Sequence, residues 1–364
     1  MGSKLGLTKT QIFFLVVQTQ VGFGMLNLPN KLQETSKNDG WLSIILAGLC
    51  IQCILIFYWL LLKRFPNYKY YEITRYVFGK YLGTLCNLAT YIYLILTSAF
   101  VLLVSAKLIH EILLNRTPYW VIGLLLFTMC MYLSNSSIQV LTRVLTVLSA
   151  LILFFIILSF LTYTLQMDVN NILPIGRSGL KNIILGVKES FISLYGFEII
   201  LFLYPLAAEK KKAFLKNITY TNVFVIGITV YFTILSMLIF NNNLIAQIKV
   251  PVVYLFRPLQ FMTTDRIDQL FFSVWAIPMV LSVSVYIFFA SKFLKSISKL
   301  KSRPILLTGI LAFFLFLLSE KSDVMLGYYA NIIELFSYLT IFIIPITLLL
   351  TSLVFRKKEK EEKI

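Results

Sequence analysis

The chain has 364 residues, of which 59% are hydrophobic, 15% aromatic and only 13% charged, and its mean hydropathy is +0.84. So few polar side chains cannot cover a water-soluble surface, which excludes a soluble globular protein and indicates that lipid is the solvent for most of the chain. The formal net charge of +17 is spread over loops and both ends of the chain, so membrane topology explains it better than a nucleic-acid partner does.

Apolar segments of about 20 residues, the length that crosses a hydrocarbon core of ~30 Å, recur along the whole sequence. We predict an all-α membrane protein with a single transmembrane domain over residues 1–364 and a basic cytoplasmic tail at 355–364. The first segment has Gln18 and Gln20 at its centre and lacks a small-residue cleavage site, which favours a retained helix over a signal peptide. About ten transmembrane helices are predicted, at residues 9–30, 40–62, 83–112, 118–135, 142–164, 183–205, 218–240, 269–291, 303–319 and 330–354.

The positions of Lys and Arg predict the orientation, because cytoplasmic segments retain basic residues and translocated loops lose them. When the loops are assigned alternately to two sides, one side has 22 Lys and Arg residues, including those of both terminal segments. The other side has nine, namely Lys31, Lys37, Arg116, Arg177, Lys181, Lys249, Arg257, Arg266 and Lys321. Both termini are therefore predicted to be cytoplasmic.

The sequence contains no pattern typical of covalent chemistry, such as a P-loop, GxGxxG, HExxH or nucleophile-elbow motif. His110 is the single histidine and has no nearby Cys or His, so neither a metal site nor a cofactor is expected. The cysteines are expected to be small packing residues of apolar segments, and they are Cys50, Cys53, Cys86 and Cys130. We therefore expect no enzymatic activity.

Two apolar segments have unusual interiors at corresponding places in the chain. The first contains Gly22-Phe23-Gly24 before Leu28-Pro29, and the sixth contains Tyr195-Gly196-Phe197-Glu198 before Tyr204-Pro205. Such paired interruptions are typical of a LeuT-like fold, a five-plus-five inverted repeat whose helices 1 and 6 are discontinuous and face each other at the midplane. The repeats would cover residues 9–164 and 183–354. Alternatively, the glycines permit close helix packing without unwinding.

A broken pair of helices favours a ligand site. Unwound backbone in hydrocarbon needs polar partners, and the N-termini of half-helices attract anionic groups such as a carboxylate. Glu198 lies beside the second break, where an ionisable group is costly and usually faces a cavity or a partner. Two interpretations stay open: a proton-linked group of a polar network, or a structural hydrogen-bond acceptor that holds the unwound segment.

Helices 3 and 8 would form walls around the breaks in this architecture. Tyr93 and Thr97 share one face of helix 3, and Ser282 and Tyr286 share one face of helix 8, each pair at i, i+4 spacing. Alternatively, such residues bond their own helical carbonyls or lie in interfacial belts. Lys188, Glu189 and Glu334 are predicted to lie at the membrane interface. The predicted ligand-binding set is Gly22, Phe23, Gly24, Tyr93, Thr97, Tyr195, Gly196, Phe197, Ser282 and Tyr286.

The order of several motifs gives the chain a family resemblance. Gly22-Phe23-Gly24-Met25-Leu26-Asn27-Leu28-Pro29, Asp39-Gly40-Trp41, Leu113-Leu114-Asn115-Arg116-Thr117-Pro118 and Gly196-Phe197-Glu198-Ile199-Ile200-Leu201-Phe202, followed by Glu209-Lys210-Lys211-Lys212, resemble the spore germination permeases. These are the B subunits of GerA-type germinant receptors, and the resemblance covers essentially the whole chain. Pro278, one turn before Ser282, departs from the pattern and is predicted to kink helix 8 and change the pocket.

The resemblance implies the fold of the amino acid, polyamine and organocation transporter superfamily and a place in the spore inner membrane. It also implies an A-type subunit and a lipoprotein C-type subunit as partners, and a small nutrient, often an amino acid, as the germinant. The predicted function is therefore a transporter-like receptor subunit that binds this nutrient in the midplane pocket and triggers germination. The alternative is a proton-coupled amino acid permease in which Glu198 titrates during transport.

Overall fold

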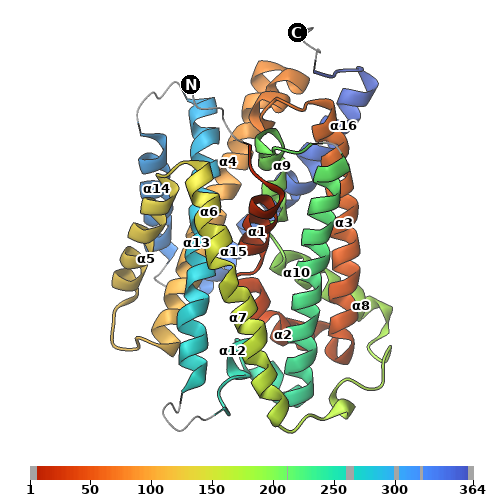
Figure 1. Cartoon of the computed structure of the whole chain (residues 1–364), viewed down its shortest axis with the longest axis vertical. Coiled ribbons are helices and arrows are strands. Elements are labelled where there is room, and N and C mark those ends of the chain that lie inside the picture. Colours follow the sequence, from red (N-terminus) through yellow and green to blue (C-terminus); the bar gives the residue numbers. More distant parts are fainter. Residues whose placement is uncertain (1–5, 211, 260–265, 299–302, 320–322, 360–364) are drawn as a thin grey trace.

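The computed structural model describes residues 6–210, 212–259, 266–298, 303–319 and 323–359, except for the side chains of Phe23, Ser319 and residues 323–326. The described chain is a bundle of helices (Figure 1), and within it β pairing is limited to an isolated bridge between Leu7 and Ala207.

The first half of the chain supplies the helices that precede residue 165. The first predicted segment is divided into α1 (Lys9–Gln20) and α2 (Phe23–Thr35), and a short turn η1 (Lys37–Asp39) follows. The next helices are α3 (Gly40–Arg64), α4 (Tyr70–Ile112), α5 (Tyr119–Ser134), α6 (Ile138–Leu148), α7 (Ala150–Ser159) and the turn η2 (Phe160–Thr164). Within α4, Gly79 (φ +82°, ψ 179°) is not helical, so residues 70–78 form a short helix of their own.

The second half begins with η3 (Val169–Asn171) and then contains the second interrupted segment. Its parts are α8 (Gly179–Ser193), η4 (Phe197–Ile199), α9 (Ile200–Leu203) and η5 (Tyr204–Leu206). The remaining helices are α10 (Lys212–Ile239), α11 (Asn242–Gln247), α12 (Pro251–Tyr254), α13 (Ile267–Ile297), α14 (Pro304–Ser319), α15 (Asp323–Ser337), the π-helical turn η6 (Tyr338–Ile343) and α16 (Ile344–Val354).

Long apolar helices confirm the predicted class of an all-α integral membrane protein. Among the described residues, six helices are long and apolar enough to cross a membrane, and α1 with α2 would make a seventh, bent by 48°. Shorter apolar helices lie at Tyr119–Ser134, Phe197–Leu206 and Pro304–Leu318. Each predicted segment thus coincides with a helix or a broken helix. The count of ten crossings and the five-plus-five repeat stay predictions.

The core of the bundle is built around α4 and α13, whose apolar windows are the most enclosed of the candidate spans. Ser134 of α5 donates to the carbonyl oxygen of Ser284 at 3.0 Å, and Ser105 of α4 lies 3.2 Å from the Met279 sulfur. Small side chains at these places let the helices approach closely, as is usual in membrane bundles. The segment from α6 to η2 is the least enclosed and presents Leu153, Ile157 and Phe160 outward.

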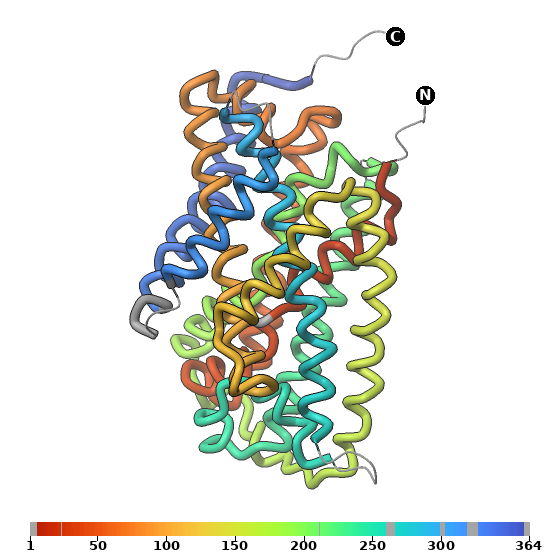
Figure 2. Tube along the Cα trace, turned by 90° about the vertical axis from the view of Figure 1, so that its left-hand side faces the viewer, coloured from red at the N-terminus to blue at the C-terminus, as the bar shows by residue number. Residues whose placement is uncertain are grey.

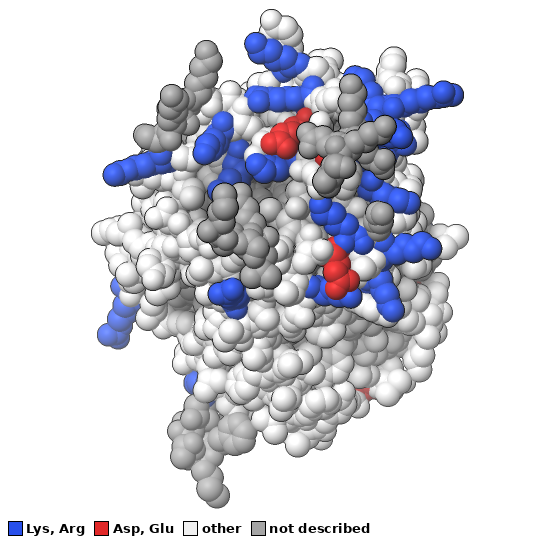
Figure 3. Space-filling view, turned by 45° about the horizontal axis from the view of Figure 1, so that its top comes forward, with Lys and Arg blue, Asp and Glu red and all other residues white. Residues whose placement is uncertain are grey.

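Hydrogen bonds gather several basic segments at one end of the bundle, which we call the basic end. Arg64 donates to the Lys357 carbonyl, Lys210 to the Pro66 carbonyl, and Lys9 pairs with Glu209 at 2.8 Å. The described chain begins and ends here (Figures 1 and 2), and Figure 3 shows Lys and Arg side chains spread over this face. This arrangement agrees with the predicted segregation of basic loops; that the basic end is cytoplasmic stays a prediction.

At the opposite end, Asp39 connects α3 to the loop before α8. Its buried carboxylate accepts hydrogen bonds from the backbone N–H groups of Gly176 at 2.7 Å and Ser178 at 2.9 Å, and the Ser178 hydroxyl donates to the Ser36 carbonyl. Ser43 of α3 donates to the Ile183 carbonyl at 3.0 Å. These contacts fix α8 against α2 and α3, and thereby fix one side of the site described next.

Candidate functional site

The first helix is interrupted in the middle of the bundle. α1 ends at Gln20, and the backbone N–H of Gly22 donates to the Gln20 carbonyl at 3.0 Å instead of continuing the helical pattern. α2 then begins at Phe23 with Gly22 as N-cap and without a side-chain cap. The backbone N–H groups of the first turn of α2 therefore have no side-chain cap. They lie at the positive end of the helix dipole, which favours a hydrogen-bond acceptor or an anionic group there.

The sixth segment is interrupted in the same way. α8 ends at Ser193, and Gly196 adopts φ +122°, a left-handed conformation that glycine tolerates and L side chains rarely adopt. The chain then continues as the turn η4 and the short helix α9. The predicted breaks are thus present at both places, and simple close packing of two continuous helices is excluded for these segments.

The two breaks touch each other. Gln20 Nε2 donates to the Leu194 carbonyl at 3.1 Å, and the Thr19 hydroxyl lies 3.4 Å from the Gly196 carbonyl oxygen. A Cβ atom at Gly24 would lie 2.2 Å from the Ser193 carbonyl oxygen, and one at Gly196 would lie 2.6 Å from that of Thr19. Glycine is therefore required at both positions, because any larger side chain would overlap backbone of the opposite break.

Glu198 is the buried centre of a polar network at the second break. Its Oε1 accepts hydrogen bonds from the Tyr93 hydroxyl at 2.9 Å and the Tyr286 hydroxyl at 3.0 Å, and its Oε2 accepts one from the Gly196 N–H at 2.7 Å. The side chain is 3% exposed. These donors compensate the cost of burying a carboxylate, and they join α4, α13 and the break into one unit.

A cavity of about 320 Å³ lies between the breaks, α4, α13 and α15, and we call it the midplane cavity. Its size is at the lower end of the roughly 300–1,000 Å³ typical of small-molecule sites, which suits a small ligand. The buried hydroxyls of Thr97 and Ser193 line it, and neither makes a hydrogen bond within the described structure. Six residues of the predicted set line the midplane cavity, namely Gly22, Gly24, Thr97, Tyr195, Ser282 and Tyr286.

Three other residues of the predicted set, Tyr93, Gly196 and Phe197, are not among the residues that line the cavity. Tyr93 and Gly196 are joined to Glu198, and Phe197 is buried between the rings of Tyr58 and Phe191. They support the lining instead of forming it. The side chain of Phe23 lies outside the described residues.

The Ser282 hydroxyl lies near two backbone carbonyl oxygens. The i, i+4 spacing of Ser282 and Tyr286 on α13, the predicted eighth helix, did not reveal these contacts. The hydroxyl lies 2.7 Å from the Gln18 carbonyl oxygen of α1 and 2.9 Å from the Pro278 carbonyl oxygen one turn earlier. It therefore ties α13 to the last turn before the first break. α13 runs through Pro278 as one helix from Ile267 to Ile297.

Charged residues at the end of the cavity away from the basic end were not in the predicted set. Lys31 of α2 pairs with Glu189 of α8 at 3.4 Å, and Lys188 pairs with Glu334 of α15 at 2.7 Å. Lys31, Glu189 and Glu334 line the cavity, as does Asn27, whose Oδ1 makes no hydrogen bond with described groups. The spacing of Gly24, Asn27 and Lys31 at i, i+3, i+7 could have revealed this polar face of α2.

The described residues contain no group of three His, Cys, Asp or Glu side chains placed to hold a metal ion. The His110 Nδ1 lies 2.8 Å from the Thr117 carbonyl oxygen, which is a structural contact. The arrangement is thus one of hydrogen-bonding groups around a small cavity.

Comparison with known proteins identifies the family. Residues 6–324 match the protein family described as "Spore germination protein". The chain belongs to the spore germination protein family. Among its members, Spore germination protein GerQB of Bacillus cereus is 26% identical over 313 residues, which cover 85% of this chain and 84% of that protein. Spore germination protein A2 of Bacillus subtilis (strain 168) is 27% identical over 337 residues, which cover 89% of this chain and 90% of that protein.

Membership of the spore germination protein family confirms the resemblance drawn from the motifs. Spore germination protein YndE of Bacillus subtilis (strain 168) is similar over a shorter region, 26% over 212 residues, or 57% of either chain. The family match extends from the segment before α1 to the start of α15, so it includes both breaks and Glu198.

Proposed function

We propose that this chain is the transporter-like B-type subunit of a spore germinant receptor, and that it binds a small nutrient, an amino acid in class, in the midplane cavity. Binding triggers germination through an A-type subunit and a lipoprotein C-type subunit in the spore inner membrane. The observation that carries the proposal is a small cavity between two helix breaks, lined by the hydroxyls of Thr97 and Ser193, which have no hydrogen-bond partner in the described part of the chain.

The cavity offers complementary groups to each part of an amino acid. The N-terminus of α2, which has no side-chain cap, and the hydroxyls of Thr97 and Ser193 supply donors for a carboxylate. The Oδ1 of Asn27 supplies an acceptor for an ammonium group. Phe100, Val101, Ile192 and Ile333 supply an apolar wall for the side chain. Such a ligand would act by binding one arrangement of the two breaks more tightly than another.

A dose–response experiment tests the proposal. Spores whose single nutrient receptor contains this chain are screened with amino acids, and the germinant that is found is then titrated against a Thr97→Leu variant. The larger apolar side chain removes a donor and fills space, so the half-maximal germinant concentration should rise on the order of tenfold to a hundredfold.

Ser282→Leu is expected to raise the half-maximal concentration as well, but it also removes the bond to Gln18, so Thr97 gives the cleaner result. Thr128→Leu is the matched control, because Thr128 lies on an exposed face of α5. Receptor abundance and the response to non-nutrient germinants should be unchanged in all variants. Wild-type curves from both Thr97→Leu and Ser282→Leu would place the germinant elsewhere, and a partner subunit would be the next candidate.

A second candidate function is proton-coupled amino acid transport, and the burial of Glu198 between two tyrosine hydroxyls favours it. A carboxylate at the hinge of two half-helices is placed to exchange a proton as they move. Uptake of the identified amino acid into proteoliposomes, driven by a proton gradient and lost in Glu198→Gln, would support a permease. Binding without uptake would support a receptor.

A further inference from the structure

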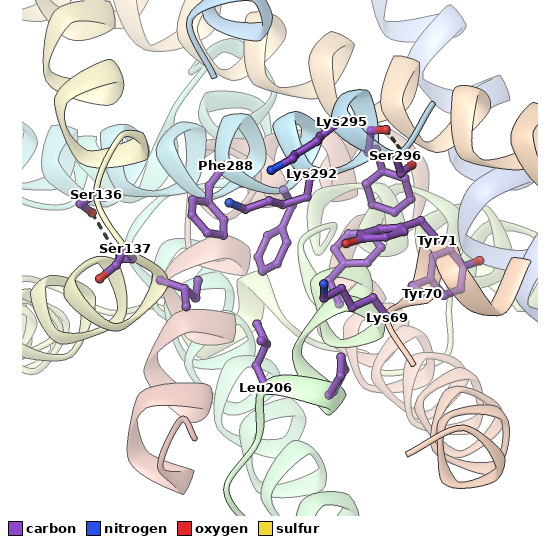
Figure 4. A pocket seen from close by; sticks show the side chains of 15 residues that line it. Lys69, Tyr70, Tyr71, Ser136, Ser137, Leu206, Phe288, Lys292, Lys295 and Ser296 are labelled. Atoms are coloured by element: carbon purple, nitrogen blue, oxygen red, sulfur yellow. Dashed lines mark hydrogen bonds between the residues drawn. The ribbon is translucent and has the colours of Figure 1, made fainter. Parts of the chain in front are cut away.

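A second cavity, of about 610 Å³, lies at the basic end of the bundle (Figure 4). Its walls come from the start of α4, the turn between α5 and α6, the segment from α9 to η5, and the last turns of α13. It shares no lining residue with the midplane cavity. We call it the basic-end cavity.

Three lysines surround this cavity. Figure 4 shows Lys292 and Lys295, from α13, and Lys69, from the segment before α4, around the same space. None of the residues that line it is acidic. Lys69 has Glu72 at 3.8 Å, with both side chains about half exposed, whereas no carboxylate within the described ranges forms an ion pair with Lys292 or Lys295.

The Nζ of Lys292 lies 4.4 Å from the centre of the Phe288 ring. Neighbouring cations repel one another, and an anion placed between them would relieve that repulsion. The charge of the cavity is therefore complementary to a negatively charged ligand.

Much of the remaining wall is apolar and aromatic, and Ser136, Ser137 and Ser296 complete it. The centre of the Phe202 ring lies 5.3 Å from the centre of the Phe289 ring and 5.1 Å from that of the Phe293 ring. Leu206 and Ile138 also line the space. A small inorganic anion would leave this wall facing water. A ligand that fills the cavity would carry an apolar body beside its charge.

We propose that the basic-end cavity binds a phosphate or carboxylate that carries an apolar body, with the charge held by Lys69, Lys292 and Lys295 and the body against Phe202, Phe289 and Phe293. Two sources offer this chemistry. One is an anionic phospholipid from the leaflet at the basic end, since basic pockets between transmembrane helices suit such headgroups. The other is a soluble organic anion on the same side of the membrane.

The test uses the full-length chain, purified in a non-ionic detergent and freed of lipid, at one fixed salt concentration. Binding is measured as the rise in thermal midpoint with phenyl phosphate, with inorganic phosphate, and with phosphatidylglycerol and phosphatidylcholine of identical chains. Phenyl phosphate or phosphatidylglycerol should stabilise the protein. Inorganic phosphate should bind on the order of tenfold more weakly than phenyl phosphate, because it leaves the aromatic wall unfilled.

Variants assign the effect to the cavity. Lys292→Gln combined with Lys295→Gln should weaken binding roughly tenfold or more, and Lys292→Arg combined with Lys295→Arg should restore most of it, because Arg keeps the charge. The matched control removes two exposed cations from the opposite end, as Arg177→Gln with Lys181→Gln, and should leave binding unchanged.

The outcomes separate the two sources. Lysine-dependent binding of phosphatidylglycerol but not of phenyl phosphate supports a lipid site, and the reverse supports a soluble anion. The proposal is overturned if neither anion stabilises the protein, if phosphatidylcholine does so equally, or if the double Gln variant binds as the wild type does. Equal affinity for inorganic and phenyl phosphate would overturn the apolar part of the proposal.

Discussion

The Tyr93 hydroxyl and the Glu198 carboxylate, 105 residues apart in the sequence, form a buried hydrogen bond of 2.9 Å. Tyr286 donates to the same oxygen, and the Gly196 N–H donates to the other. Three donors thus converge on one carboxylate beside the second break. These hydrogen bonds join the second break to α4 and α13 through Glu198.

Replacing Glu198 with Gln should destabilise the protein. An amide has one acceptor oxygen and one donor group, so it cannot accept from all three donors, and one buried donor loses its partner at a cost of about 1–3 kcal/mol. The measurements are the thermal midpoint of the purified chain and its abundance in spore membranes. Glu111→Gln serves as control, because Glu111 forms a half-exposed ion pair away from the breaks.

The germination phenotype of Glu198→Gln separates the two roles. Normal abundance with lost response would indicate that ionisation is required. Loss of the protein from the membrane would indicate a structural role, and normal abundance with normal germination would refute any required ionisation.

Replacing Gly24 with Ala should separate the two breaks. The added methyl group would lie 2.2 Å from the Ser193 carbonyl oxygen, which is backbone and cannot move aside alone, so α2 and α8 must shift. Overpacking of this kind costs about 1–3 kcal/mol, and we expect a lower thermal midpoint and a reduced germinant response.

Gly227→Ala on α10 is the matched control, because no atom lies within 4 Å of its added Cβ and alanine favours a helix. Equal behaviour of the two variants would show that the contact between Gly24 and Ser193 has no energetic importance.

The ion pair between Lys188 and Glu334 should influence access to the midplane cavity, because Glu334 lines the cavity and Lys188 belongs to α8. Lys188→Glu places two like charges together and should change the half-maximal germinant concentration by up to about fivefold, since exposed pairs contribute roughly 0.2–1 kcal/mol. The exchange of both charges, Lys188→Glu with Glu334→Lys, should return the value towards wild type. Lys249→Glu breaks a pair elsewhere and should not change it.

Single-cysteine labelling in sealed cells tests the orientation. In a variant without its four native cysteines, a membrane-impermeant maleimide should modify a probe at Lys181, at the end opposite the basic end, and spare probes at Lys80 and Lys216. The expectation rests on the excess of basic residues at one end of the bundle. Labelling of Lys80 and Lys216 before membrane disruption would reverse the predicted orientation.

The sequence by itself determined the class of the protein and the places where its helices break. Composition and long apolar segments require a lipid solvent, and the Gly22-Phe23-Gly24 and Tyr195-Gly196-Phe197 segments mark the interruptions because glycine tolerates irregular backbone. The i, i+4 spacing also placed Thr97, Ser282 and Tyr286 on the faces that meet the cavity. These are local properties, since they depend on residues within a few turns of one another.

Only the tertiary structure decided which groups meet. Glu198 is separated by 105 residues from Tyr93 and by 88 from Tyr286, and no local spacing encodes such pairs. The same limit applies to the ion pairs at the end of the midplane cavity away from the basic end, because Lys31 pairs with Glu189 and Lys188 with Glu334 across helices. The limit applies also to side-chain hydroxyls. Packing gives the Ser282 hydroxyl two acceptor oxygens, whereas the Thr97 hydroxyl has no hydrogen-bond partner among the described residues. The Thr97 hydroxyl is therefore available as a donor to a ligand in the midplane cavity.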